Sequence, residues 1–139
     1  MAQTVSDVMT RNPATIDGSQ TVGDAARLMR EHDTGAVVVT ADGEVAGIIT
    51  DRNIALRVVA DGKPADTPVR EACSGEGLRT VAPDTAIEQA VQIMRQAAVR
   101  RLPVLENGRA VGIVSLGDLA IERDEASALA DISAAERDE

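Results

Sequence analysis

Residues 45–55 have the sequence VAGIITDRNIA, and residues 110–120 have the closely similar sequence AVGIVSLGDLA. In both, a glycine is followed by two apolar residues, Thr or Ser, two variable residues, Asn or Asp, an apolar residue and alanine. The two glycines, Gly47 and Gly112, are 65 positions apart. The same offset relates further identical pairs, without gaps: Thr15 and Thr80, Ala25 and Ala90, Met29 and Met94, Arg30 and Arg95, Val39 and Val104, Gly43 and Gly108, Ile48 and Ile113. This period predicts two copies of one supersecondary unit.

Each copy contains the same order of signals. A short extended segment is followed by apolar residues at helical spacing, which are Val22, Ala25, Ala26 and Met29 in the first copy and Ile87, Ala90, Val91 and Met94 in the second. Two apolar runs then flank Asp42-Gly43 or Asn107-Gly108, a strong hairpin signal. A second helix begins at Thr50 or Ser115. The unit is therefore β-α-β-β-α, an α+β fold whose layers are of the α/β type.

The two apolar runs of each copy are apolar at consecutive positions, which predicts strands buried on both faces. We expect Ser19 or Thr21 to cap the first helix, and Thr85 with Glu88 to form a capping box in the second copy. The predicted boundaries are residues 1–62 for the first repeat, 63–68 for a linker, 69–123 for the second repeat and 124–139 for an acidic tail; Gly62, Pro64 and Pro68 are the breakers that mark the connection between the repeats.

Composition excludes several classes of function. The 139 residues carry a net charge of −9, which disfavours nucleic acids and acidic membrane surfaces as partners. No stretch has the length and apolar character of a membrane span or a signal peptide, and the single cysteine cannot form an intrachain disulfide. These features predict a cytoplasmic protein. Because Phe, Tyr and Trp are absent, a pocket must hold its ligand with aliphatic side chains and backbone groups.

The duplicated motif Gly-apolar-apolar-Thr/Ser-x-x-Asp after a hairpin resembles the cystathionine-β-synthase (CBS) domain, and a tandem pair resembles the Bateman module of that family. The resemblance extends from about Val5 to about Arg123. It implies two repeats packed about a pseudo-twofold axis, with clefts between them that hold AMP, ADP, ATP or S-adenosylmethionine. It also implies that two modules join into a homodimer.

In the second copy, Gly112 permits close approach of a ligand or of backbone, and Ser115 lies at a helix start, where free N–H groups favour a phosphate. Asp118 can accept hydrogen bonds from the two hydroxyls of a ribose. The resemblance places the adenine edge at the backbone of Thr80 and Val81. The alternative is structural, because Ser-x-x-Asp is also a helix-capping pattern.

The first copy offers Thr15, Ile16, Thr50 and Asn53 at the equivalent positions. Because asparagine can bind a diol but carries no charge, we expect a weaker or absent site there.

Arg100 and Arg101 occupy the position where the family often places basic residues against nucleotide phosphates. In related modules such residues can reach the partner repeat's cleft, so the acid and the arginines can serve different clefts. Exposure to solvent, or pairing with surface acids, explains the two arginines equally well.

We therefore expect a non-catalytic regulatory module without an obligatory cofactor, which binds an adenosine-containing ligand and signals to an effector protein that the sequence does not identify. No base–nucleophile pair stands out, and His32 and Cys73 are too far apart in sequence to suggest a metal site. The alternative is a dimeric scaffold that keeps the fold and has lost the ligand, which Asn53 favours.

Overall fold

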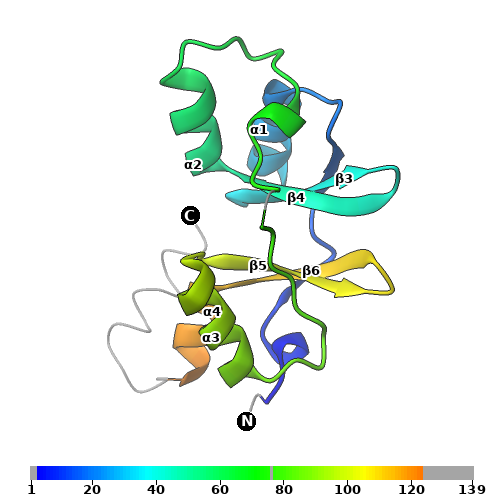
Figure 1. Ribbon diagram of the computed structural model, residues 1–139, viewed down its shortest axis with the longest axis vertical. Coiled ribbons are helices and arrows are strands. Elements are labelled where there is room, and N and C mark those ends of the chain that lie inside the picture. Colours follow the sequence, from blue (N-terminus) through cyan, green and yellow to red (C-terminus); the bar gives the residue numbers. More distant parts are fainter. Residues whose placement is uncertain (1–2, 76, 124–139) are drawn as a thin grey trace. The chain divides into compact units, whose positions relative to one another are not determined.

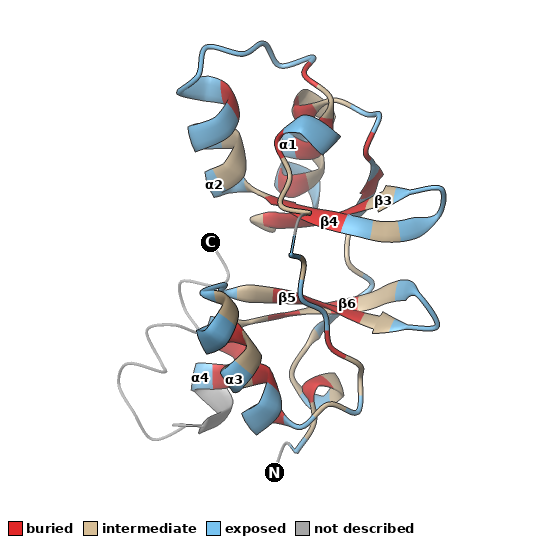
Figure 2. Ribbon diagram, in the orientation of Figure 1, coloured by how far each residue is buried: buried red, intermediate tan, exposed pale blue. Residues whose placement is uncertain are grey.

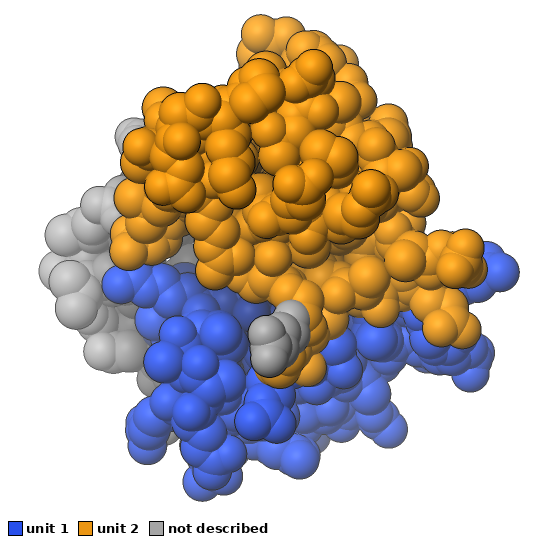
Figure 3. Space-filling view, turned by 45° about the horizontal axis from the view of Figure 1, so that its top comes forward, with its two compact units in different colours: residues 1–12, 79–139 blue, residues 13–78 orange. Residues whose placement is uncertain are grey.

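The computed structural model describes residues 3–75 and 77–123. The chain forms two compact units, shown in Figure 3: unit 1 comprises residues 1–12 and 79–139, and unit 2 comprises residues 13–78. The first repeat lies in unit 2 and the second in unit 1. The predicted mixed fold of two repeats is confirmed, and each unit is described by itself below.

Unit 2 contains a three-stranded sheet of order β2-β3-β4, in which β2 and β3 are parallel and β3 and β4 form the predicted hairpin. Two helical segments, α1 and α2 with its continuation η2, lie on one face of this sheet (Figure 1). The elements are β2 (Thr15–Asp17), α1 (Val22–His32), β3 (Ala36–Ala41), β4 (Glu44–Thr50), α2 (Asp51–Ile54), the π-helical turn η2 (Ala55–Val59) and the 3-10 turn η3 (Val69–Glu71).

Unit 1 contains a sheet of order β1-β6-β5 with α3 and α4 on one face (Figure 1). The strand expected at the start of this repeat is reduced to a single parallel bridge between Val81 and Val104. The elements are η1 (Val5–Asp7), β1 (Thr10–Arg11), α3 (Ile87–Ala97), β5 (Arg101–Glu106), β6 (Arg109–Ser115) and α4 (Leu116–Arg123).

Each repeat is completed by the chain segment that precedes the other repeat. Residues 3–12 pack on the second repeat, where β1 pairs with β6 and the fully buried Val5 joins the core. Residues 64–75 pack on the first repeat, where Ser74 bridges Ile48 and the fully buried Val69 joins the core. Each compact unit therefore contains one repeat together with the segment that precedes the other repeat.

The expected linker, residues 63–68, is part of this packing. The backbone oxygen of Thr67 accepts a hydrogen bond from the Val22 amide at 2.8 Å, and that of Ala65 accepts one from the Gly23 amide at 2.9 Å. Only 7% of Thr67 is exposed. The segment covers the start of α1 and is not a free connection. The predicted acidic tail, residues 124–139, lies outside the described residues.

The helices bury the faces that their periodicity predicts (Figure 2). Val22, Ala25 and Met29 of α1 are buried. The equivalent Ile87, Ala90 and Met94 of α3, which repeat the same spacing, are buried as well. Of the other two residues predicted on these faces, Val91 is half-buried, and the prediction is wrong for Ala26, which is exposed. Residues 36–39 of β3 and residues 102–104 of β5 are buried without alternation, which confirms the prediction for the first apolar run of each copy. In the second runs, β4 is buried continuously only at residues 47–49, and β6 alternates between buried and half-buried residues.

The helix caps match the prediction at one helix and differ at the other. Thr21 caps α1, because its Oγ1 accepts a hydrogen bond from the Asp24 amide at 3.1 Å. The capping box expected from Thr85 is wrong: α3 begins at Ile87, and the Thr85 hydroxyl instead accepts a hydrogen bond from the Ala82 amide at 2.9 Å.

The exchange of segments can be tested with one core substitution in each segment. Val5→Ala and Val69→Ala each remove two methyl groups from a fully buried site, so each is expected to cost about 2 kcal/mol of unfolding free energy. Hydrogen exchange should accelerate in β5 and β6 for Val5→Ala, and in β3 and β4 for Val69→Ala. Faster hydrogen exchange in the repeat that directly follows the substituted segment in the sequence would contradict the packing of each segment on the other repeat.

Ala98 is a non-glycine residue in the left-handed region, with φ 56°, at the end of α3. Glycine avoids the clash of Cβ in this conformation, so Ala98→Gly should raise the unfolding free energy by about 0.5–1 kcal/mol. Thermal or urea unfolding measures the change. Ala97→Gly, one residue earlier and inside the helix, is the control and should destabilise the protein by about 1 kcal/mol.

Candidate functional site

The residues predicted to bind a ligand lie where the second hairpin strand of each repeat enters a helix. In unit 1 this junction joins β6 to α4 at Ser115. In unit 2 it joins β4 to α2 at Thr50. The two junctions have the same geometry, because Leu116 N–H donates to the Arg100 carbonyl at 2.7 Å and Asp51 N–H donates to the Gly35 carbonyl at 3.0 Å.

A reciprocal pair of hydrogen bonds closes the unit 1 junction. The Ser115 amide donates to Asp118 Oδ2 at 2.9 Å, and the Asp118 amide donates to Ser115 Oγ at 3.1 Å. This is a capping box, so the structural alternative for Ser115 and Asp118 is confirmed. Only 5% of Asp118 is exposed, so a ribose would contact only a small part of this residue's surface.

The junction of unit 2 repeats this arrangement with an uncharged side chain. The Thr50 amide donates to Asn53 Oδ1 at 3.0 Å, and the Asn53 amide donates to Thr50 Oγ1 at 3.1 Å. Asparagine therefore serves the cap as well as aspartate does, and the difference between Asn53 and Asp118 is one of charge.

Four of the residues predicted for the second copy lie at the same end of the unit 1 sheet. Arg101 pairs in register with Ser115, and the backbone of Arg100 holds the first turn of α4. Arg100 is exposed and Arg101 is half-buried. The junction thus combines a helix start and one carboxylate with the backbone of two arginines.

The remaining predicted residues are divided between surface and core. Thr15 and Thr80 are exposed, at the start of β2 and just before the Val81 bridge. Ile16 and Val81 are 2% and 6% exposed, and each packs in the core of its unit. Only the backbone of these two apolar residues is therefore suited to polar contacts, and the Val81 amide and carbonyl already bond to β5.

The glycines of the motif are explained by the chain itself. A Cβ on Gly112 would lie 2.6 Å from Met9 Sδ and 2.9 Å from the Thr10 carbonyl oxygen. A Cβ on Gly47 would lie 2.7 Å from the Ser74 carbonyl oxygen. Residues 3–12 and 64–75, which we call the exchanged segments, each cross a strand at one of these glycines. Only glycine fits at the crossing, and this accounts for the close approach that the sequence predicted at Gly112.

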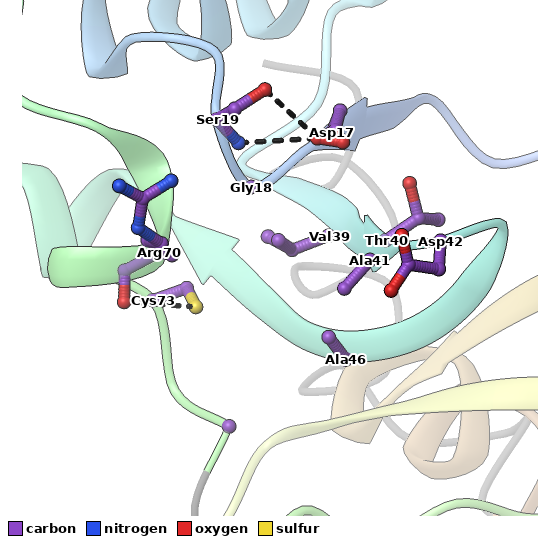
Figure 4. A pocket seen from close by; sticks show the side chains of 11 residues that line it. Asp17, Gly18, Ser19, Val39, Thr40, Ala41, Asp42, Ala46, Arg70 and Cys73 are labelled. Carbon is purple, nitrogen blue, oxygen red and sulfur yellow. Dashed lines mark hydrogen bonds between the residues drawn. The ribbon is translucent and has the colours of Figure 1, made fainter.

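A pocket of about 390 Å³ lies at the other end of the unit 2 sheet, beside the β3–β4 turn (Figure 4). Among the residues that the structure describes, the charged ones that line it are Asp17, Asp42 and Arg70. Asp17 Oδ1 accepts hydrogen bonds from the amide of Ser19 at 3.2 Å and from its hydroxyl at 3.0 Å. None of the predicted site residues lines this pocket.

One wall of the pocket is the exchanged segment, and Arg57 holds that segment in place. Arg57 Nη1 donates to the carbonyl oxygens of Ala72 and Cys73 at 3.0 and 3.2 Å. Burial raises the pKa of the Cys73 thiol, so this cysteine is protonated at neutral pH and is a poor nucleophile. Cys73 is partly buried and packs against the core of unit 2.

Two further properties concern only the described part of the chain. Within residues 3–75 and 77–123, no three His, Cys, Asp or Glu side chains lie close enough together to hold a metal ion. None of the helices in this same range is both long and apolar enough to cross a membrane.

Solved structures of similar proteins share the fold. A signal-transduction protein with CBS domains from Burkholderia ambifaria is 30% identical, with a TM-score of 0.79 over 89% of this chain and 96% of that one. Hypoxic Response Protein I, solved with two coordinated zinc ions, is 31% identical, with a TM-score of 0.72 over 88% and 99% of the two chains. A hexameric CBS-CP12 protein from cyanobacteria is 30% identical, with a TM-score of 0.79 over 89% of this chain and 74% of that one.

Similarity at the level of sequence is also extensive. The CBS domain-containing protein YhcV of Bacillus subtilis is 44% identical over 119 residues, which are 86% of this chain and 84% of that protein. The family model for the CBS domain matches residues 5–60 and 76–124, once for each repeat. The chain therefore belongs to the CBS-domain family, whose members are generally regulatory ligand-binding modules, and it contains two such domains.

Proposed function

We propose that this chain is a non-catalytic regulatory module that binds an adenosine-containing ligand, such as AMP, ADP, ATP or S-adenosylmethionine, and transmits its binding state to a partner protein. The observation that carries the proposal is the unit 1 junction, where Asp118 is held by Ser115 at the start of α4. A carboxylate fixed in this way is oriented before the ligand arrives, which lowers the entropic cost of gripping a ribose. No obligatory cofactor is proposed.

The surroundings of the junction suit such a ligand. Arg100 and Arg101 bring positive charge to the end of the sheet where α4 begins, in a chain of net charge −9. Guanidinium groups bind phosphate through paired hydrogen bonds. The equivalent residues in unit 2, Gly35 and Ala36, are uncharged. The proposal therefore assigns the stronger site to unit 1 and a weaker one to Thr50 and Asn53.

The ligand proposal is tested by separating charge from capping. Asp118→Asn should keep the cap, because Asn53 makes the same two hydrogen bonds in unit 2, while it removes the charge that binds the ribose. Titration calorimetry with AMP, ATP and S-adenosylmethionine should show affinity for at least one of them, reduced at least about tenfold in this variant. Asn53→Asp should strengthen binding at the first repeat.

Two results would contradict the ligand proposal. One is the absence of heat and of any thermal shift for all three compounds at millimolar concentration. The other is unchanged affinity in Asp118→Asn. Unfolding curves of this variant, compared with those of wild-type protein, control for loss of the cap.

A second candidate function is a ligand-free scaffold that acts through self-association, which we propose as a homodimer. Two observations favour it: the cap already accounts for Ser115 and Asp118, and η2 exposes two large apolar side chains. Leu56 and Val59 are 49% and 71% exposed and lie three residues apart in η2. Exposed apolar patches of this kind are typical of protein interfaces.

Self-association through η2 is tested by removing its apolar surface. Leu56→Ser combined with Val59→Ser should convert a dimer to a monomer in sedimentation velocity, because the apolar contact that holds the copies together is lost. Val99→Ser removes an exposed valine of unit 1, 38% exposed, and should leave the assembly unchanged. A monomeric wild-type protein at high concentration, or a dimer that survives the double substitution, would contradict this interface.

A further inference from the structure

The pocket of unit 2 has an internal control, because unit 1 is built from the same repeat and shows which residues the fold requires. The hydrogen bonds define the equivalent positions. Arg70 N–H donates to the Gly18 carbonyl at 3.1 Å, and Ser6 N–H donates to the Pro83 carbonyl at 2.9 Å. Arg70 is thus equivalent to Ser6, and Gly18 to Pro83.

Small residues open the pocket in unit 2. Gly18, Ala41, Ala46, Cys73 and Gly75 line it, and none has a side chain larger than that of cysteine. Larger residues occupy the equivalent places in unit 1, in the same order: Pro83, Glu106, Val111, Met9 and Arg11. Met9, for example, packs against Gly112, whereas the shorter Cys73 lies beside Gly47. The fold therefore does not require the cavity.

The charges of the pocket also differ between the two repeats. All three charged lining residues have uncharged counterparts in unit 1. The pairs are Asp17 and Ala82, Asp42 and Asn107, and Arg70 and Ser6. Within the described residues, the Arg70 guanidinium has no hydrogen bond or ion pair. A cation without a structural partner, beside a cavity whose small lining residues are replaced by larger ones in unit 1, is suited to a ligand.

The arrangement of the charges defines the class of ligand. In Figure 4, Arg70 and Asp42 lie on opposite sides of the pocket with Val39 between them, and Asp17 lies beside the Gly18–Ser19 turn. Ala41 and Ala46 add apolar surface next to Val39. A simple anion would meet two carboxylates, and a simple cation would meet the guanidinium. A zwitterion satisfies both signs of charge at once.

We propose that this pocket binds a small aliphatic α-amino acid. Arg70 takes the α-carboxylate through the paired hydrogen bonds of its guanidinium, and the negative charge of Asp17 and Asp42 elsewhere on the lining favours the α-ammonium group without direct contact. The aliphatic side chain rests on Val39, Ala41 and Ala46. A volume of about 390 Å³ is at the small end of the range for small-molecule sites, as a ligand of this size requires.

This site is separate from the proposed adenosine site. Its lining shares no residue with Thr15, Ile16, Thr50 and Asn53 of the same unit. β3 begins beside Thr50 and ends at the pocket, five residues later, which is about 16 Å along a strand. The two proposals can therefore fail or succeed independently.

The test uses the full chain, labelled with ¹⁵N, and L-leucine as the probe. The ionic strength is kept low, because all three charged residues are exposed and salt would screen their charges. Titration to about 20 mM should shift the amide signals of Gly18, Ser19, Ala41 and Asp42, with saturation. Two analogues divide the charges: 4-methylpentanoate has no ammonium group, and 3-methylbutylamine has no carboxylate. Both should bind at least about tenfold more weakly than leucine.

The variants insert residues that unit 1 already carries at the same positions, so they are compatible with the fold. Arg70→Ser and Asp42→Asn should each weaken leucine binding, Arg70→Ser by at least about tenfold. Arg79→Ser is the matched control for the first. Asp33→Asn is the control for the second, because Asp33 and Asp42 share left-handed backbone with φ 50° and 54°. Neither control should change the affinity.

Three outcomes would overturn the proposal. Absence of saturable shifts at the pocket with leucine excludes the site. Equal binding of 4-methylpentanoate shows a site for anions and excludes recognition of a zwitterion. Unchanged affinity in Arg70→Ser, in a variant whose amide spectrum and unfolding curve match the wild type, excludes the role of the guanidinium.

Discussion

The structure depends on the passage of one backbone segment across each hairpin at a glycine. At Gly112 the Met9–Thr10 segment crosses β6, and at Gly47 the Cys73–Ser74 segment crosses β4. Because a Cβ at either glycine would come within 3 Å of a backbone oxygen of the crossing segment, no other residue fits without a shift of the chain. The crossing adds a strand or a bridge to the sheet edge and carries a buried valine into the core, so each repeat is incomplete without it.

The same crossing places the candidate sites. The motif glycine lies three residues before the Thr or Ser that caps the next helix, so the crossing and the cap belong to one strand. Fixing the strand at the glycine therefore also fixes the start of the helix and the side chain of Asn53 or Asp118. In unit 2 the crossing segment continues as the wall of the pocket, where Arg57 holds its carbonyl oxygens. Both candidate sites are thus positioned by a backbone contact that belongs to the fold itself and involves no ligand.

Local signals in the sequence predicted what local interactions determine. The hairpin turns at Asp42-Gly43 and Asn107-Gly108 have positive φ at all four residues, as that pairing of residues favours. The exchange of residues 3–12 and 64–75 was not predicted, because it depends on contacts between residues far apart in sequence, such as Val5 with the core of the second repeat. Thr85 misled the cap prediction because the Ala82 amide competes for its hydroxyl. The pocket could have been found by comparing the copies, since its small and charged residues differ from their counterparts.

A duplicated chain separates the requirements of folding from those of function better than a single copy does. Residues that the fold requires recur in both repeats, as the motif glycines and the two capping boxes do. Residues that differ while the surrounding hydrogen bonds stay the same are not needed for folding, and Arg70 with Ser6 is such a pair. By this criterion the Thr50 and Ser115 caps are structural in the first place, and any ligand there uses groups that the fold has already positioned. In the unit 2 pocket, Asp17 accepts hydrogen bonds from Ser19 and Asp42 forms the hairpin turn, so Arg70 is the charged residue whose placement has no such structural reason.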